Sequence, residues 1–256
     1  TIDLDALKAI SSFNSISLLL AVVALVAGMY FDGLRLQRLV KIGGYKLSIR
    51  AVLRVIFSNY FMAMLTPGAS GGAVAQVLVL RSYGVPISKG TPIVLIRTVF
   101  SIMFLVIMLP LVFLRDAIEI PYISRDMLLI FAVLAVIAAL VGTYILQTKY
   151  MRQFVYNLAQ RFKAHNTKDW LSKLETLNQG LGLLYKQPVQ SLIVFIESGL
   201  SLLCLYCIAP ALMYAFTPDI PIIDILDRMI LLNLILYFAP TPGGTGIAEG
   251  LFVVLF

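Results

Sequence analysis

The sequence PTPGGTGIAEG, residues 240–250, separates two apolar runs that would otherwise form one continuous helix. The runs are MILLNLILYFA (residues 229–239) and LFVVLF (residues 251–256). The two prolines of the interruption remove backbone donors and disrupt the preceding helical turn, and its four glycines permit positive φ angles. The pattern therefore predicts two short helices joined by a sharp turn, with free amides at the start of the second helix.

The composition indicates that the chain is embedded in a lipid bilayer. Hydrophobic residues make up 60% of its 256 residues, charged residues 13%, and the mean hydropathy is +0.94. A soluble domain carries roughly 25% charged residues. Apolar runs approach or exceed the roughly 20 residues that a helix needs to cross a bilayer, and no strand-like alternation competes with them. We expect an all-α, polytopic transmembrane helical bundle. Residues 1–256 would form one multi-pass integral membrane domain, located in the cell membrane.

The apolar runs divide the chain into two halves, each with one broken helix. We expect half 1 over residues 15–114 with a break at 66–72, and half 2 over residues 127–256 with a break at 240–250. The chain starts without Met and stops inside an apolar run, so we expect a fragment of a slightly longer protein. The expected runs are 15–31, 51–65, 73–80, 92–114, 127–146, 189–216 and 225–239.

Basic residues predict how the bundle is oriented. They follow the first span and recur in the segment 149–186, so the positive-inside rule places both regions in the cytoplasm. For Arg81 and Lys89 to lie in the cytoplasm as well, the segment 51–80 must enter the membrane from the cytoplasm and return to it. The second broken segment follows an external loop, so it must enter the membrane from outside. This predicts two oppositely inserted re-entrant hairpins. Apolar stripes in 149–186 predict amphipathic helices on the cytoplasmic leaflet. The net charge of +7 indicates binding to anionic lipid headgroups rather than to nucleic acid.

The two breaks are copies of one motif. TPGASG (residues 66–71) and TPGGTG (residues 241–246) share the pattern Thr-Pro-Gly-small-Ser/Thr-Gly, 175 positions apart. With opposite insertion, this is the signature of an inverted repeat. Paired interrupted helices in the two halves of a transporter point to a binding site near the midplane, where the amides of restarting helices attract anions. Unpaired backbone is tolerated at that depth only where protein or a wet cavity surrounds it.

Two sequence blocks carry a resemblance to a known family. The block LTPGASGG with the following RSYG, then a span with an internal arginine, and the late block PTPGGTGIAEG resemble the flippase-like family typified by the transmembrane region of lysylphosphatidylglycerol synthases, also known as the multiple peptide resistance factor family. The likeness covers nearly the whole chain. It implies a membrane module that moves a lipid, often with an anionic or modified headgroup, between leaflets. The chain is similar to the stand-alone members, which lack an aminoacyl transferase domain.

The candidate substrate-binding residues lie in the two breaks and among the charges within apolar runs. Each such charge is costly in a bilayer and needs compensation. We expect the arginines to contact a lipid phosphate, and one of the glutamates to bind a cationic headgroup or a coupling proton. The alternatives are an internal Arg–Glu pair that holds the halves together, and breaks without any ligand. The candidates are Thr66, Pro67, Gly68, Gly71, Gly72, Arg97, Glu197, Arg228, Pro242, Gly243, Gly244, Thr245, Gly246 and Glu249.

The sequence predicts neither a metal nor a cofactor. Cys204 and Cys207 are expected to be small buried residues, and His165 a solvated loop residue. We favour a lipid flippase or scramblase over two alternatives. The first is a carrier for a small anionic solute or ion, and the second is a lipid-modifying enzyme, for which only Glu197 or Glu249 would serve as acid or base. Beyond the lipid substrate, the partners considered are a second copy of the chain and a lipid-synthesising enzyme.

Overall fold

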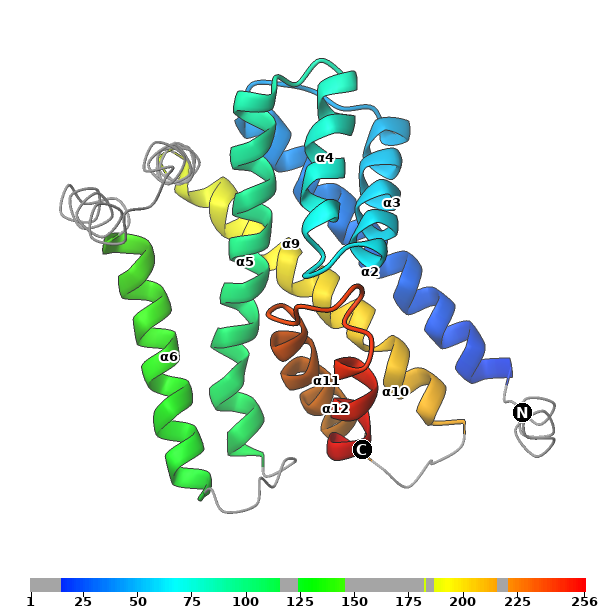
Figure 1. Cartoon of the computed structure of the whole chain (residues 1–256), viewed down its shortest axis with the longest axis vertical. Coiled ribbons are helices and arrows are strands. Elements are labelled where there is room, and N and C mark those ends of the chain that lie inside the picture. The colour runs from blue at the N-terminus through cyan, green and yellow to red at the C-terminus, as the bar shows by residue number, and fades with distance from the viewer. Residues whose placement is uncertain (1–14, 116–123, 146–181, 183–186, 216–220) are drawn as a thin grey trace.

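The computed structural model describes residues 15–115, 124–145, 182, 187–215 and 221–256. Within these ranges the chain forms helices and no sheet, which confirms the all-α prediction (Figure 1). The predicted amphipathic segment 149–186 lies outside the described residues, Gly182 apart.

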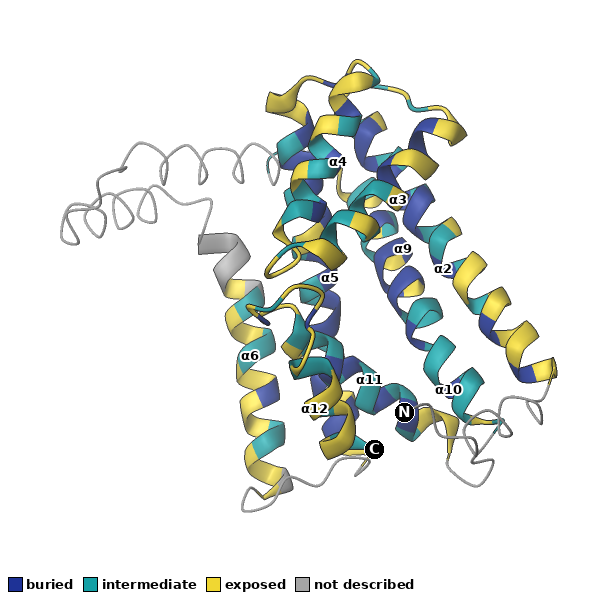
Figure 2. Cartoon of the chain, turned by 45° about the vertical axis from the view of Figure 1, so that its right-hand side comes forward, coloured by how far each residue is buried: buried dark blue, intermediate teal, exposed yellow. Residues whose placement is uncertain are grey.

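Three helices of the described part are long and apolar enough to cross a membrane. They are α2 (Ser15–Ile42), α5 (Ile87–Leu114) and the joined pair α9 (Pro188–Tyr206) and α10 (Ile208–Met213). The helix α6 (Arg125–Ile145) contains a shorter apolar stretch and packs beside α5. Many large apolar side chains on α2 and α6 are exposed, as Figure 2 shows in yellow, and bilayer lipid is the solvent that such a surface requires. The chain is a membrane protein.

The first helix is longer than the sequence predicted. We expected a span over residues 15–31 followed by a basic cytoplasmic segment, but α2 continues to Ile42. The helix continues because the apolar period does: Leu36, Leu39 and Val40 are buried in the core. Arg35, which we expected in the cytoplasmic segment, is therefore a buried helical residue.

The two broken segments form two helical hairpins. One consists of α3 (Ile49–Leu65) and α4 (Ser70–Ser82), and the other of α11 (Ile222–Leu236) and α12 (Ile247–Leu255). In Figure 1 the α3–α4 hairpin occupies the upper half of the molecule and the α11–α12 hairpin the lower half. Their turns face each other at mid-height, because each hairpin runs inward from its own end of the bundle.

The helices α2 and α9 pack against each other along the centre of the bundle, between the two hairpins. They pack closely because Gly28 leaves room for Leu205, whose Cγ would lie 2.7 Å from an added Cβ. Ser201 Oγ donates to the Gly28 carbonyl at 3.0 Å across the same contact. One core cluster of buried residues then joins α2, α3, α4, α5 and α9, and it includes Leu36, Val55, Leu80, Ile93 and Val194.

Candidate functional site at the meeting of the two breaks

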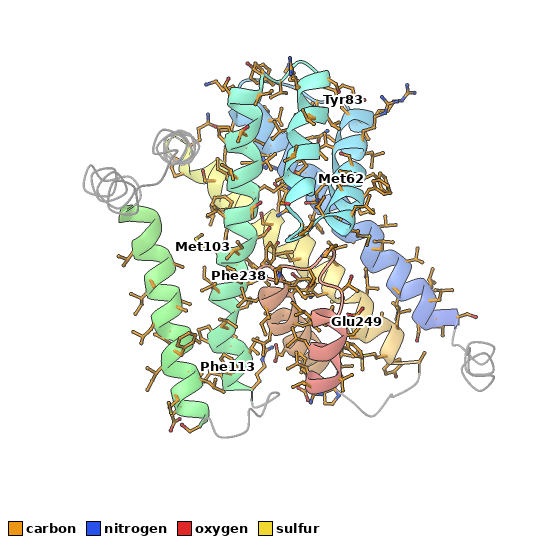
Figure 3. The ribbon with its side chains drawn as sticks, viewed as in Figure 1. Met62, Tyr83, Met103, Phe113, Phe238 and Glu249 are labelled. Carbon is orange, nitrogen blue, oxygen red and sulfur yellow. The ribbon has the colours of Figure 1, made fainter. Side chains whose placement is uncertain are left out.

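The turns of the two hairpins touch. Pro67 and Pro242 form an isolated antiparallel β-bridge, although they are far apart in the sequence. Figure 3 shows the surrounding side chains, with Met62 on the α3–α4 hairpin and Phe238 and Glu249 on the α11–α12 segment. The two Thr-Pro-Gly motifs therefore meet in the middle of the bundle, where the sequence analysis expected a site.

Each turn is closed by the same two hydrogen bonds. A backbone amide donates to the threonine carbonyl of the motif, and a hydroxyl donates to the proline carbonyl. The donor and acceptor residues are Ala69 and Thr66 (3.2 Å) with Ser70 and Pro67 (2.9 Å) in the first turn, and Gly244 and Thr241 (3.1 Å) with Thr245 and Pro242 (2.7 Å) in the second. The shared sequence motif thus produces a shared local fold.

The contact between the turns is reciprocal. Gly68 has a φ of +59°, and a Cβ added there would lie 3.7 Å from the carbonyl oxygen of Ala239. Gly243 has a φ of +60°, and its Cβ would lie 3.2 Å from the carbonyl oxygen of Met64. Met64 and Ala239 each precede the glycine of their own motif by four positions. The left-handed backbone favours glycine at both places, and at Gly243 the opposite turn also leaves little room for a side chain.

The two turns differ in how the second helix begins. Thr66 Oγ1 donates to the Met62 carbonyl and accepts from the Gly71 amide, both at 2.8 Å. In the second turn the Gly246 amide donates instead to Glu249 Oε2 at 2.5 Å, which satisfies one free amide at the start of α12. Thr241 Oγ1 is buried and has no hydrogen-bond partner among the described residues.

Most residues of the two turns are exposed in the described structure. Pro67, Gly68, Pro242 and Gly243 are all exposed, and Ser70 and Thr245 are exposed beside them. Part of the polar backbone of the breaks is therefore exposed, whereas Gly244 and the hydroxyl oxygen of Thr241 are buried.

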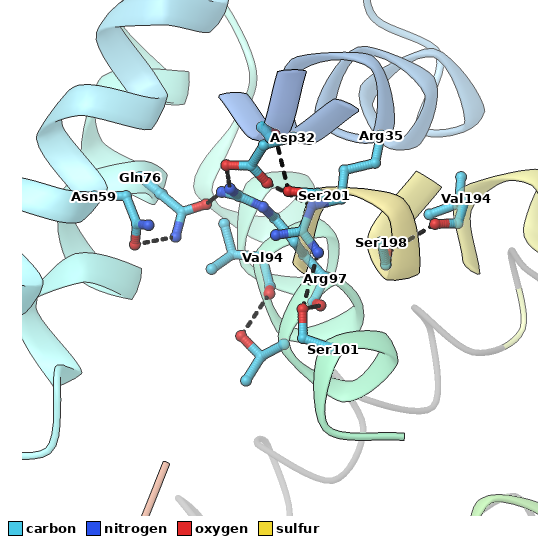
Figure 4. Close-up of polar contacts among 12 residues, drawn as sticks. Asp32, Arg35, Asn59, Gln76, Val94, Arg97, Ser101, Val194, Ser198 and Ser201 are labelled. Carbon is cyan, nitrogen blue, oxygen red and sulfur yellow. Dashed lines mark hydrogen bonds and ion pairs between the residues drawn. The ribbon is translucent and has the colours of Figure 1, made fainter. Parts of the chain in front are cut away.

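A buried charge cluster lies behind the first break (Figure 4). We use this name for Asp32, Arg35 and Arg97. The Arg97 side chain, 4% exposed, donates to Asp32 and to Gln76, and Arg35 donates to Asp32 at 2.5 Å and to Ser101 at 2.8 Å. Asp32 is fully buried, so both arginines reach it away from water.

The buried charge cluster has an excess of one positive charge, because two guanidinium groups share one carboxylate. Within the described residues, the Nε of Arg97 is buried without a hydrogen-bond partner. The cluster is tied to the α3–α4 hairpin through Gln76, which donates to Asn59 at 2.7 Å, and through Tyr60, which donates to Asp32 at 3.4 Å. Gln76 lies five residues beyond Gly71, or about 7.5 Å along the helix, so the cluster is close to the break.

Residues 4–256 match the family model described as the lysylphosphatidylglycerol synthase TM region. The chain belongs to this family. No curated protein and no solved structure matches it. The family and the apolar helices together associate the chain with membrane lipid, and they confirm the resemblance stated from the two Thr-Pro-Gly blocks.

Within this family member, the remaining charged candidates have partners of their own. Glu197 accepts from Arg38 at 2.7 to 3.1 Å in a bidentate pair that joins α9 to α2. An internal Arg–Glu pair was one of the alternatives, and the arginine of this pair is Arg38. The guanidinium of Arg228, on α11, lies 5.7 Å from the ring centroid of Phe256. The role of these residues in binding substrate stays a prediction.

The sequence analysis missed the acidic member of the buried charge cluster. The expected first span ended at residue 31, so Asp32 and Arg35 both fell outside it and their pairing within one helix was not considered. A signal was present, because an acid and a base three positions apart are neighbours on a helix. Asn59 and Gln76, two polar residues inside apolar runs, were a second signal.

The described residues contain no group of three or more His, Cys, Asp or Glu side chains that could hold a metal ion.

Proposed function

We propose that the protein moves a lipid with an anionic or modified headgroup between the leaflets of the cell membrane. The observation that carries this proposal is the reciprocal contact of the two breaks, made by hairpins that run inward from opposite ends. In a bilayer, such interrupted backbone is expected only where it lines protein or a wet cavity. The proposal includes the multi-pass topology, the two re-entrant hairpins and the inverted repeat of the two halves.

The buried charge cluster supports an anionic headgroup as the substrate. Its excess positive charge and the unpaired Nε of Arg97 favour a phosphate, which accepts several hydrogen bonds from a guanidinium. Asp32 would remain paired with Arg35 while Arg97 turns to the ligand. The motif glycines and threonines would bring backbone amides to the same headgroup, as the starts of α4 and α12 face the meeting point.

We propose transport without chemical change of the lipid. The two carboxylates that an enzyme would need are already occupied: Glu197 by Arg38, and Glu249 by the Gly246 amide. Rocking of one half against the other would expose the site to each leaflet in turn. A small soluble anion would find the same positive charge, so the experiment must distinguish the two substrates.

The test is a leaflet-asymmetry assay. The protein is reconstituted into liposomes with phosphatidylglycerol that carries a nitrobenzoxadiazole label, and dithionite bleaches the label on the outer leaflet. We expect bleaching to go beyond the half seen in protein-free liposomes, and Arg97→Gln to reduce it. Lys89→Gln, which removes an exposed cation outside the site, should behave like the wild type.

Three results would contradict the proposal. The label on the inner leaflet would stay protected in the presence of the protein. Alternatively, mass spectrometry would detect a chemically changed lipid, which indicates an enzyme, or the liposomes would release trapped phosphate while lipid stays in place, which indicates a carrier for small anions.

A further inference from the structure

A groove runs along the outer side of the α3–α4 hairpin. Its volume is about 430 Å³, which lies within the range of small-molecule sites. The upper part of its wall is apolar, and the end near the break carries two hydroxyl-bearing residues. The lining residues are Met62, Thr66, Ser70, Gly71, Val74, Ala75, Leu78 and Val79.

The face of α4 that forms the groove ends in a cation. Gly71, Val74 and Leu78 line the groove, and Arg81 continues the same face with the spacing of helical neighbours. The groove extends about 10 Å along the helix from Gly71 to Leu78, and Arg81 lies one turn beyond it. Arg81 is exposed, so its guanidinium is available at the open end of the groove.

The neighbouring helix brings a second cation to the same end. Arg54 of α3 precedes Met62 by eight residues, so it lies about 12 Å further from the break along the helix. Its Nη1 donates to the hydroxyl of Tyr83, which follows α4 directly. Figure 3 shows Tyr83 at the upper end of this hairpin, with Met62 about halfway down.

This end of the hairpin has the character of a membrane surface that attracts anions. The sequence from residue 33 to residue 115 contains no Asp or Glu, so no acidic side chain of this stretch competes for the two arginines. Ile49 and Ile87 are 72% and 44% exposed at the same end. Exposed apolar residues beside cations are typical of the boundary between hydrocarbon and headgroups.

We propose that this groove binds one acyl chain of an anionic phospholipid, whose phosphate is held by Arg54 and Arg81. The apolar wall suits a hydrocarbon chain, and the two guanidinium groups at its open end complement a net negative headgroup. The methyl end of the acyl chain would reach Ser70 and Gly71 at the break. The inference concerns binding alone, so it stands or fails independently of the transport proposal.

The experiment is native mass spectrometry of the purified full chain in detergent. The protein is titrated with dioleoylphosphatidylglycerol and with dioleoylphosphatidylcholine, which has the same chains and a zwitterionic headgroup. We expect the anionic lipid to bind more tightly. Arg54→Gln and Arg81→Gln should each reduce that preference about fivefold, whereas Arg81→Lys should keep most of it. Lys89→Gln is the control for loss of an exposed cation elsewhere.

The acyl-chain part of the proposal has its own variant. Ala75→Phe fills the groove and should weaken the binding of both lipids, and Leu111→Phe, at a 44% exposed position on α5, should not. Equal affinity of the wild type for the two lipids would overturn the proposal, and so would unchanged binding to Ala75→Phe. If the wild-type protein binds neither lipid in this titration and still exchanges lipid between leaflets, this site is rejected and the transport proposal stays intact.

Discussion

The sharpest prediction concerns the single carboxylate of the buried charge cluster. Replacing Asp32 by asparagine keeps the shape of the side chain but removes the negative charge that Arg35 and Arg97 share. Two guanidinium groups would then face each other in a site where the Asp32 side chain has no exposure to solvent. Removing one partner of a buried ion pair destabilises proteins by about 3–5 kcal/mol, and here two partners lose their counter-charge.

Arg97→Met should be less harmful than Asp32→Asn, although both break the same contact. After Arg97→Met, Asp32 keeps Arg35 at 2.5 Å, so no net charge remains buried. The main loss is the hydrogen bond to Gln76, and a buried amide left unsatisfied costs about 1–3 kcal/mol. The double variant should be more stable than Asp32→Asn alone, because it leaves one unpaired guanidinium rather than two.

The assay is thermal unfolding of the detergent-solubilised protein, followed by the loss of the monodisperse peak in size-exclusion chromatography. We expect Asp32→Asn to lower the midpoint by about 10 °C and Arg97→Met by less. Asp224→Asn, a change of the same kind at a half-buried position of α11, should have little effect. The reasoning is refuted if Asp32→Asn is as stable as the wild type, or if Arg97→Met is the less stable of the two.

Two further variants test contacts elsewhere by the same thermal assay. Gly243→Ala should destabilise the protein by about 1–3 kcal/mol, because φ is +60° and the Met64 carbonyl oxygen lies 3.2 Å from the added Cβ. The control is Gly44→Ala, which has a φ of +88° and open space around it and therefore measures the backbone strain alone. Equal losses of stability in the two variants would argue against the close contact. Arg38→Gln should cost about 2 kcal/mol because it leaves the carboxylate of Glu197 unpaired. Adding Glu197→Gln should restore most of this stability, and a further loss in the double variant would contradict the pairing.

The helices and breaks could be predicted from the sequence because both depend on local patterns. Apolar runs of sufficient length can only be helices in a bilayer, and the Thr-Pro-Gly motifs at 66–71 and 241–246 can only interrupt them. The repetition of the motif also directed attention to the place where Pro67 and Pro242 meet. The local fold of each turn followed from its own residues.

The partners of the buried charges could not be predicted in the same way. Arg97 was recognised as costly within a span, but its counter-charge is 65 positions away on α2, and only the packing of α2 against α5 brings Asp32 to it. The same holds for Arg38 and Glu197, which are 159 positions apart. The end of α2 was misplaced because charges normally mark the end of a span, whereas here Asp32 and Arg35 pair with each other inside the protein.

The central claim is that the two breaks meet inside the bundle, and a disulfide tests it most directly. Residues paired in an antiparallel bridge have Cα atoms about 4.5–5.5 Å apart, which is within the range that a disulfide can span. Pro67→Cys and Pro242→Cys are combined in a chain that also carries Cys204→Ser and Cys207→Ser, and the membranes are treated with a mild oxidant. The structure predicts that both new thiols become protected from a maleimide reagent until a reductant is added. If both stay reactive, as in a control pair of Pro242→Cys with Lys89→Cys, the two breaks do not meet.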